Sequence, residues 1–271
     1  MKKHIFALTI VILLLVTSIA FAMFDDASKH WAADDINALV QSGAVNGYSD
    51  GTFRPDNTIT RGEFTKILVV LKADAVTAAT GHWAQRYVNT AVDKGYLPYK
   101  HFDDLDKPIS RQEMAYMIAK AADNPTPYPY AFSLSLKDFT SMDSFYLETS
   151  YTAYGSGIIG GYKDNTFRPT AFATRAEAAT MLMRMHREGN RQPRTVSFNQ
   201  QTLSYYDGTD GKPALIAVSG KVYDVSAIGS WKDGVHRDGI KAGKDLTDFM
   251  QGSPHSPAIV DELELVGVFT K

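Results

Sequence analysis

The feature that most constrains this chain is a helix-start motif that occurs at three places along the sequence. Each copy opens with a hydroxyl residue and carries a glutamate three positions later; the opening residues are Thr60, Ser110 and Thr174. In such a capping box the hydroxyl accepts from the backbone N–H of the glutamate, and the carboxylate returns to the N–H of the cap. The motif therefore predicts three helices that begin at these residues.

Apolar residues follow each box at offsets of four, seven, eight and eleven positions. This spacing predicts that every one of these helices buries a single face. The residues of the three faces are Phe64, Ile67, Leu68 and Leu71; Met114, Met117, Ile118 and Ala121; and Ala178, Met181, Leu182 and Met185.

A second helical pattern lies upstream of each capped helix. A His-Trp pair begins the first pattern at Trp31 and the second at Trp83, whereas the third pattern, around residues 146–157, lacks the pair. A helix pair this short cannot bury its apolar stripe alone, so the three units are predicted to pack together. We expect an all-α module of three repeats.

An arginine stands at the first position of each capped helix, at Arg61, Arg111 and Arg175. The positive end of a helix disfavours a cation there, so the repeated arginine indicates an anionic partner such as a carboxylate on a sugar. The unpaired N–H groups of a helix start would favour the same anion. The alternative is that each arginine pairs with a loop aspartate of its own repeat.

Two loops complete a pattern that resembles surface-layer homology (SLH) domains. Residues 47–55 read GYSDGTFRP and residues 161–169 read GYKDNTFRP, and Phe24-Asp25-Asp26 resembles the start of such a repeat. The resemblance divides the chain into repeats at 23–72, 73–123 and 124–188. It implies that grooves between repeats bind secondary cell-wall polysaccharide, commonly pyruvylated. The residues that it marks for this role are Arg61, Arg111, Arg175, Gly47, Asp50, Gly161 and Asp164.

Residues 1–22 have the layout of a secretory signal peptide: two lysines, an apolar run from Ile5 to Val16, and an Ala-x-Ala cleavage pattern. We expect export, no membrane contact after cleavage, and a place in the cell wall or S-layer of a Gram-positive-type envelope. The formal net charge of −2 argues against a nucleic-acid partner. There is no cysteine, so packing alone must stabilise the exported chain.

A polar stretch at 189–194 predicts an exposed linker, and short strands and turns after it predict a small α+β domain at 195–271. We expect a strand at 213–218, a hairpin turn into 221–225, helices at 242–250 and 258–263, and a final strand near 266–269. The whole is a multidomain chain in which this domain follows the all-α module.

Two histidines, His236 and His255, fall in the C-terminal domain among apolar residues. Each alone would usually be a solvated surface histidine. Two imidazoles on opposite walls of an apolar cleft can ligate a haem iron on both faces, whereas zinc would normally need three or four ligands. The residues expected to line the cleft are Trp231, Leu246, Phe249, Ile259 and Leu263.

Residues 195–270 are similar to the cytochrome b5-like haem/steroid-binding family, through Val218–Val225, Trp231, His236, residues 242–247, Phe249 and His255. The resemblance implies non-covalent b-type haem with His236 and His255 as axial ligands of the iron. The family's first ligand motif is H-P-G-G, and this chain has His-Arg-Asp-Gly from His236. Ligation through Met250 is the weaker alternative.

The leading hypothesis is a wall-tethered haem protein that transfers electrons to an unknown redox partner protein. A second is a surface protein that binds haem or another small ligand without a redox role, and a third is a structural wall protein with an empty ligand-binding module. Motifs of serine nucleophiles, phosphate loops and paired carboxylates are absent from the sequence, so we do not expect an enzyme.

Overall fold

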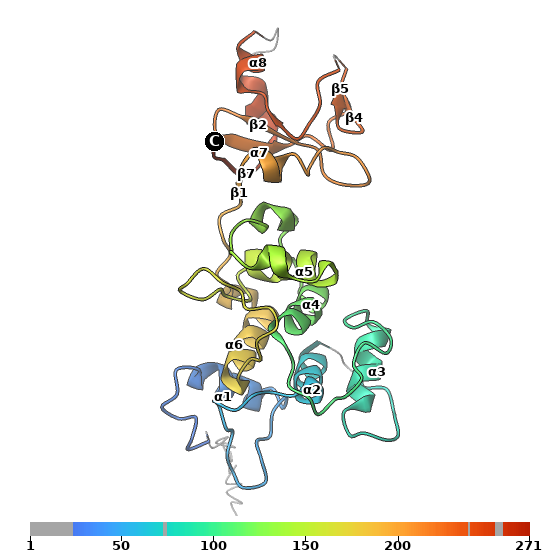
Figure 1. The fold of residues 1–271 in the computed structure, drawn as a ribbon, viewed down its shortest axis with the longest axis vertical. Helices are drawn as coiled ribbons and strands as arrows, with labels where there is room; N and C mark the ends of the chain where they lie inside the picture. Colours follow the sequence, from blue (N-terminus) through green and yellow to red (C-terminus); the bar gives the residue numbers. More distant parts are fainter. Residues whose placement is uncertain (1–23, 73–74, 238, 253–256) are drawn as a thin grey trace, which may run out of the picture.

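The computed structural model describes residues 24–72, 75–237, 239–252 and 257–271. The predicted signal peptide lies outside these residues. Two parts follow one another along the long axis: a mainly helical part, and a part built around a β-sheet that carries the C-terminus (Figure 1). None of the helices among the described residues combines the length and the apolar character needed to cross a membrane.

The helical part contains two α-helices from each repeat, as the sequence predicts. They are α1 (Ala33–Gln41) and α2 (Arg61–Lys72), α3 (Gln85–Asp93) and α4 (Arg111–Ala121), and α5 (Ser144–Gly155) and α6 (Arg175–His186). Short 3-10 turns accompany them: η1 (Pro129–Phe132), η2 (Phe139–Ser141) and η3 (Glu188–Asn190). Helix α3 packs on α2, α5 on α4, and α1 on α6, so the first helix of each repeat packs on the capped helix of another repeat and the three repeats close a ring.

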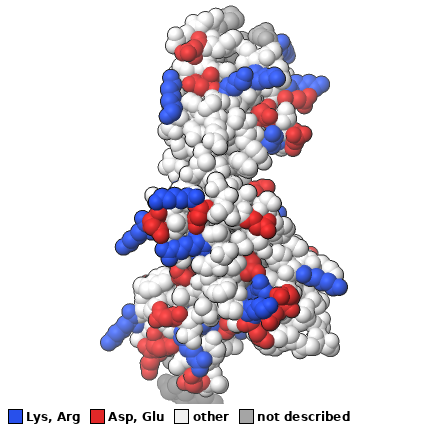
Figure 2. All heavy atoms as spheres, in the orientation of Figure 1, with Lys and Arg blue, Asp and Glu red and all other residues white. Residues whose placement is uncertain are grey.

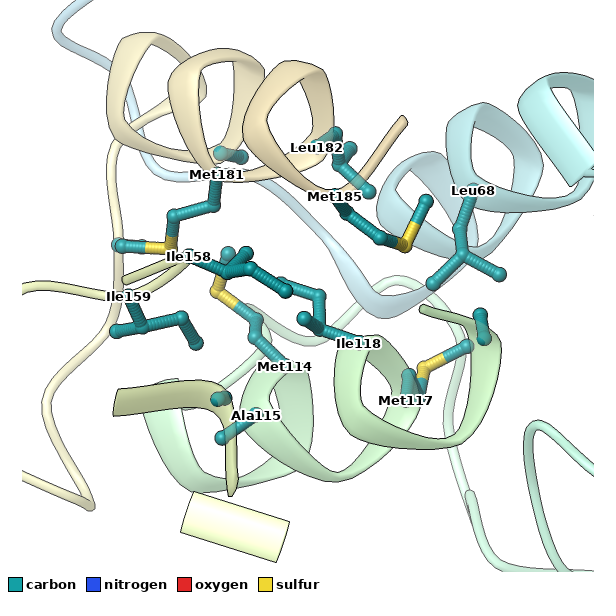
Figure 3. Packing of buried hydrophobic residues seen from close by; sticks show 14 of the residues in the cluster. Leu68, Met114, Ala115, Met117, Ile118, Ile158, Ile159, Met181, Leu182 and Met185 are labelled. Carbon is teal, nitrogen blue, oxygen red and sulfur yellow. The ribbon is translucent and has the colours of Figure 1, made fainter. Parts of the chain in front are cut away.

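The three capped helices meet at the centre of the ring. All the apolar faces predicted from the sequence are buried there, except that Leu71 is only partly covered. In Figure 3 the labelled side chains of α2, α4 and α6 point into one core: Leu68, Met114, Met117, Ile118, Met181, Leu182 and Met185.

The prediction of an all-α module is wrong. The extended segments before the capped helices pair with one another through isolated β-bridges, namely Thr58 with Thr174, Thr60 with Pro108, and Ser110 with Phe172. These bridges join repeats 1 and 3, 1 and 2, and 2 and 3. An extended segment before a helix cannot satisfy its N–H and C=O groups within that helix, so here neighbouring repeats provide the partners.

The C-terminal part is an α+β unit with one curled sheet in the order β1-β7-β3-β2-β6. Strands β2 and β3 form the predicted antiparallel hairpin, β7 runs antiparallel to β3 and parallel to β1, and β6 is parallel to β2. A separate two-stranded ribbon pairs β4 with β5. The element bounds are β1 (Ser197–Phe198), α7 (Gln200–Leu203), β2 (Leu215–Val218), β3 (Lys221–Asp224), β4 (Trp231–Lys232), β5 (Val235–His236), β6 (Lys244–Asp245), α8 (Thr247–Gln251), η4 (Pro257–Glu262) and β7 (Glu264–Phe269).

The predicted helix at 242–250 is correct only in its second half, which is α8. Its first half contains Gly243 at a φ of +78°, and the N–H of Gly243 donates to the carbonyl of Leu215. This contact begins the pairing of β6 with β2, so the segment joins the sheet before the helix starts. The last predicted helix is the 3-10 turn η4 instead.

Aromatic residues join the two parts of the chain. The rings of Tyr130 in η1 and Tyr205 stack with centroids 3.8 Å apart, and the hydroxyl of the buried Tyr206 accepts from the N–H of Tyr130 at 2.9 Å. The hydroxyl of Tyr128 donates to Asp224 at 3.1 Å. Figure 2 shows few charged side chains at this waist on the face in view.

The predicted linker at 189–194 is largely exposed but fastened to the helical part. Arg191 donates to the carbonyls of Arg184, Met185 and Asp123. The guanidinium of Arg194 lies 3.6 Å above the ring of Tyr154 and donates to the carbonyl of the same residue. These contacts fasten the linker to the helical part.

Candidate functional sites

The first groove, called the repeat-1 groove, is a cavity of about 200 Å³ to which all three repeats contribute. Repeat 1 provides Gly47, Tyr48, Glu63 and Lys66 from its loop and from α2. Repeat 2 provides Trp83, which is 50% exposed, and repeat 3 provides Arg175.

The repeat-3 groove is built from the equivalent residues, with each repeat taking the role of its neighbour in the ring. Its volume is about 190 Å³. Repeat 3 contributes its loop glycine and tyrosine together with Glu177 and Arg184. Trp31 comes from repeat 1 and Arg111 from repeat 2. The structure therefore brings four of the predicted polysaccharide residues, Gly47, Arg175, Gly161 and Arg111, to the walls of two equivalent grooves.

The arginines of these grooves are buried and lie over aromatic rings. Arg175 is 5% exposed; its Nε donates to the carbonyl of Phe53 at 2.8 Å, and its Nη1 pairs with Glu63 at 2.8 Å. Arg111 is 2% exposed and donates to the carbonyls of Phe167 and Gly160 at 2.8 and 2.7 Å. Their guanidinium carbons lie 4.7 Å and 4.8 Å from the ring centres of Tyr48 and Tyr162, respectively.

The loop aspartates take a different partner from the one considered in the sequence. Asp50 pairs with Arg54, and Asp164 pairs with Arg168, each four residues further along. Hydrogen bonds from a threonine hydroxyl and from this arginine lower the pKa of each aspartate to about 2. These aspartates thus stabilise their own loops, whereas Arg61, Arg111 and Arg175 reach into the loop of another repeat.

The first three N–H groups of each capped helix are already engaged in hydrogen bonds. The N–H groups of the first two residues of α2 donate to the carbonyls of Lys107 and Leu105. The corresponding groups of α4 and α6 donate in the same way to repeats 3 and 1. The third position of each helix donates to its own capping hydroxyl. The guanidinium groups, rather than the helix ends, are therefore the cationic feature of the grooves.

Two aspartates that were not predicted as site residues shape the groove loops. Asp26 accepts from the N–H groups of Phe53 and Arg54, and Asp138 accepts in the same way in repeat 3. Gly47 has a φ of +71°, and a Cβ there would lie 2.3 Å from the ring of Phe24. The F-x-D start at Phe24-Asp25-Asp26 was the sequence signal for this loop support.

The His-Trp pairs position the tryptophans of the grooves. Nδ1 of His30 accepts from the N–H of Ala32, and its Nε2 lies 3.3 Å from Asp56. His82 makes the same contacts with Ala84 and Asp106. Each histidine thus caps the turn before α1 or α3, and the neighbouring indole is left at the groove.

Arg61, the arginine of repeat 1 that reaches into repeat 2, has a different setting. Nη1 of Arg61 pairs with Asp103 at 2.7 Å, and Nη2 pairs with Glu113 at 2.6 Å. Its buried Nε meets no acceptor among the described residues. In the other grooves this atom donates to the carbonyl of the TFRP loop, which repeat 2 has replaced.

The C-terminal part contains an apolar pocket of about 530 Å³ between the β4–β5 ribbon and the α8–η4 segment. Trp231 on β4 and His236 on β5 are register partners, with ring centroids 5.2 Å apart. All the predicted lining residues that the structure describes reach this pocket: Trp231, His236, Leu246, Phe249, Ile259 and Leu263. His255, the second predicted ligand, lies outside the described residues.

The pocket has the size of an ordinary small-molecule site. Its walls are mostly apolar, and its polar members include the imidazole of His236, Arg237 and Glu262. Met250, the alternative ligand, also lines it. An apolar site with an imidazole suits a flat, largely apolar ligand that has one point of polar attachment.

Comparison with known proteins identifies a family model and relatives that match the helical part. Residues 24–65 and 135–179 match the family model of the S-layer homology domain. Exoglucanase XynX of Acetivibrio thermocellus is 29% identical over 179 residues, which cover 62% of this chain and 16% of that protein. The cellulosome-anchoring protein of the same organism is 34% identical over 120 residues, which cover 39% of this chain and 26% of that protein. The matched part of the chain therefore spans no more than 26% of the length of these relatives.

A solved cytochrome b5 domain protein of Methanococcoides burtonii is 34% identical to a stretch that covers 27% of this chain and 96% of that one, with a TM-score of 0.27. The matches in the helical part show that the chain carries S-layer homology domains at two stretches and is a cell-surface protein of a Gram-positive-type envelope.

Proposed function

We propose that this chain is a wall-anchored haem protein. Its repeats bind an anionic secondary cell-wall polysaccharide, and its C-terminal pocket binds b-type haem for electron transfer to a partner protein. The observation that supports the first half best is a buried arginine beside an exposed tryptophan in each of two equivalent grooves.

This pairing suits an acidic sugar. A guanidinium recognises a carboxylate through charge-assisted hydrogen bonds, and the exposed indole offers a flat apolar face to a sugar ring. No carboxylate of the described residues lies within ion-pair distance of Arg111, so its charge is available to a ligand. Lys66 and Arg184 add a second cation to the repeat-1 and repeat-3 grooves, respectively.

The test is binding to purified cell-wall sacculi, with and without the polysaccharide removed. The chain without residues 1–22 should sediment only with the intact sacculi. The double variant Trp31→Ala/Trp83→Ala should stay in solution, while Tyr99→Ala, which removes an aromatic ring that is 76% exposed and outside both grooves, should bind normally. Equal sedimentation of the double variant would contradict the groove assignment.

The residues of the C-terminal pocket fit haem in chemistry. His236 provides a nitrogen ligand, and Trp231, Leu246, Phe249, Ile259 and Leu263 provide the apolar walls that a porphyrin needs. The proposed second ligand, His255, falls between Phe249 and Ile259 in the sequence, and both of these residues line the pocket. When bound through two histidines, haem supplies one-electron transfer and leaves no open position for a substrate. We therefore propose an electron carrier and not an enzyme.

An absorption spectrum of the chain mixed with haemin and then reduced tests this proposal. A sharp low-spin spectrum is expected, and both His236→Ala and His255→Ala should abolish it. His186→Ala, which removes an exposed histidine at the end of α6, is the matched control and should leave the spectrum unchanged. A spectrum no different from that of free haemin would overturn the haem assignment.

The alternative is a surface protein that binds haem or another small ligand without a redox role. The mostly apolar pocket supports this alternative, because such a pocket suits many flat ligands. Reversible reduction of the bound haem would support electron transfer. Tight binding without a reversible potential would support the alternative.

A further inference from the structure

We infer that the groove of the second repeat is closed by the protein's own aromatic side chains, so that each chain holds two acidic sugars, one in the repeat-1 groove and one in the repeat-3 groove. This inference rests on the proposed polysaccharide binding and specifies it. It is carried by two features of the groove of repeat 2: Tyr116 and Phe145 stack on one another there, and Arg61, which reaches it from repeat 1, pairs with two carboxylates.

Equivalent positions identify the residues that would form a third groove. Phe145 stands five positions before Ser150 at the inner face of α5, as Trp31 and Trp83 stand five positions before Ile36 and Val88. Phe145 therefore occupies the tryptophan position of the third pattern. Tyr116, five positions after Arg111, likewise occupies the position that Lys66 and Thr180 hold in the open grooves.

These two residues lie against each other instead of framing a cavity. The rings of Tyr116 and Phe145 are parallel to within 13°, with centroids 4.9 Å apart. The imidazole of His101 stacks on both rings, at 5.9 Å from Tyr116 and 5.5 Å from Phe145. The hydroxyl of Tyr146 lies 3.0 Å from Nε2 of His101 and holds this ring in place. Each of these rings loses one face to its neighbour, and that face is not available to a sugar.

The ion pairs of the three arginines support the same inference. Arg61 forms ion pairs with two carboxylates, Arg175 with one, and Arg111 with none of those described. Each carboxylate in contact with a guanidinium offsets its attraction for another anion. In the second groove the aromatic rings are therefore stacked on one another, and the arginine is paired with more carboxylates than in the other two grooves.

The stoichiometry of binding tests this inference. The titrant is a monosaccharide that carries one pyruvyl-ketal carboxylate, added to the chain without residues 1–22 in a calorimeter. Two sites per chain are expected. Trp31→Ala and Trp83→Ala should each remove one site, and Phe145→Ala, which alters a ring that is 47% exposed, should leave both.

A spectrum of the indole N–H groups gives an independent measurement. The chain has three tryptophans, at positions 31, 83 and 231, which give separate signals. The signals of Trp31 and Trp83 should shift on addition of the sugar, while that of Trp231 should not. Three sites, or a site lost in Phe145→Ala, would overturn the inference and leave the proposed function standing. No binding to either groove would overturn both.

Discussion

At the scale of single residues, the neighbouring loop determines which partners the arginine at the start of each capped helix binds. Arg111 and Arg175 donate through Nε to the carbonyl of a TFRP loop, and both line a groove. Repeat 2 has no such loop, and Arg61 turns to Asp103 and Glu113 instead. The arginine at this helix position is therefore a ligand-binding group in repeats 2 and 3 and, by our inference, a structural group in repeat 1.

Glu63→Gln tests how far a carboxylate weakens a groove. Glutamine can keep the capping box of α2, but it removes the negative charge beside Arg175. The affinity of the repeat-1 groove for the acidic monosaccharide should rise by about threefold to tenfold, measured by calorimetry. Glu177→Gln is the matched control, because Glu177 makes no ion pair with Arg111 among the described contacts, and it should change affinity less. Equal effects of the two variants would show that the ion pair between Glu63 and Arg175 does not set the affinity.

At the scale of elements, the capped helices hold the ring together from their first turns. The first two N–H groups of α2, α4 and α6 donate to carbonyls of another repeat, while the box residues satisfy the third. The cap is therefore part of the contact between repeats as well as of the helix. Loss of a cap should destabilise the ring beyond the helix that carries it.

Ser110→Ala removes the hydroxyl of the buried capping box of α4. We expect a loss of about 1–2 kcal/mol in the free energy of unfolding, because the hydroxyl bonds both the N–H and the carboxylate of Glu113. Urea denaturation followed by circular dichroism measures it. Ser135→Ala, an exposed position outside the caps, is the control and should change stability by less than about 0.5 kcal/mol. A similar loss in both variants would contradict a specific role of the cap.

At the scale of the whole molecule, the two parts share a continuous apolar core. Buried residues of the C-terminal part, among them Phe198, Leu203 and Tyr206, belong to the same cluster as the core of the repeats. The 3-10 turn η1, which lies between α4 and α5, provides the aromatic rings of this joint. The wall-binding part should therefore hold the C-terminal pocket in a defined orientation, not on a loose tether.

Tyr130→Ala removes the ring that stacks on Tyr205 and contacts Tyr151. We expect a loss of about 2 kcal/mol and a single thermal transition that separates into two, because the two parts lose their shared contact. Differential scanning calorimetry measures both effects. Tyr99→Ala, which removes an exposed ring, should melt like the unaltered chain. One unchanged transition for Tyr130→Ala would show that the joint does not couple the two parts.

Local signals in the sequence determined the repeats, the capped helices and their buried faces, the β2–β3 hairpin and six of the fourteen residues that line the C-terminal pocket. Capping, hydrophobic periodicity and turn chemistry act within a few residues, so they can be recognised without a structure. The partners of the three arginines, the β-bridges between repeats, the pairing of Gly243 into the sheet and the aromatic joint join residues far apart in the chain. Only the tertiary structure decided these, because a guanidinium or an N–H group takes whichever acceptor the packing brings within reach.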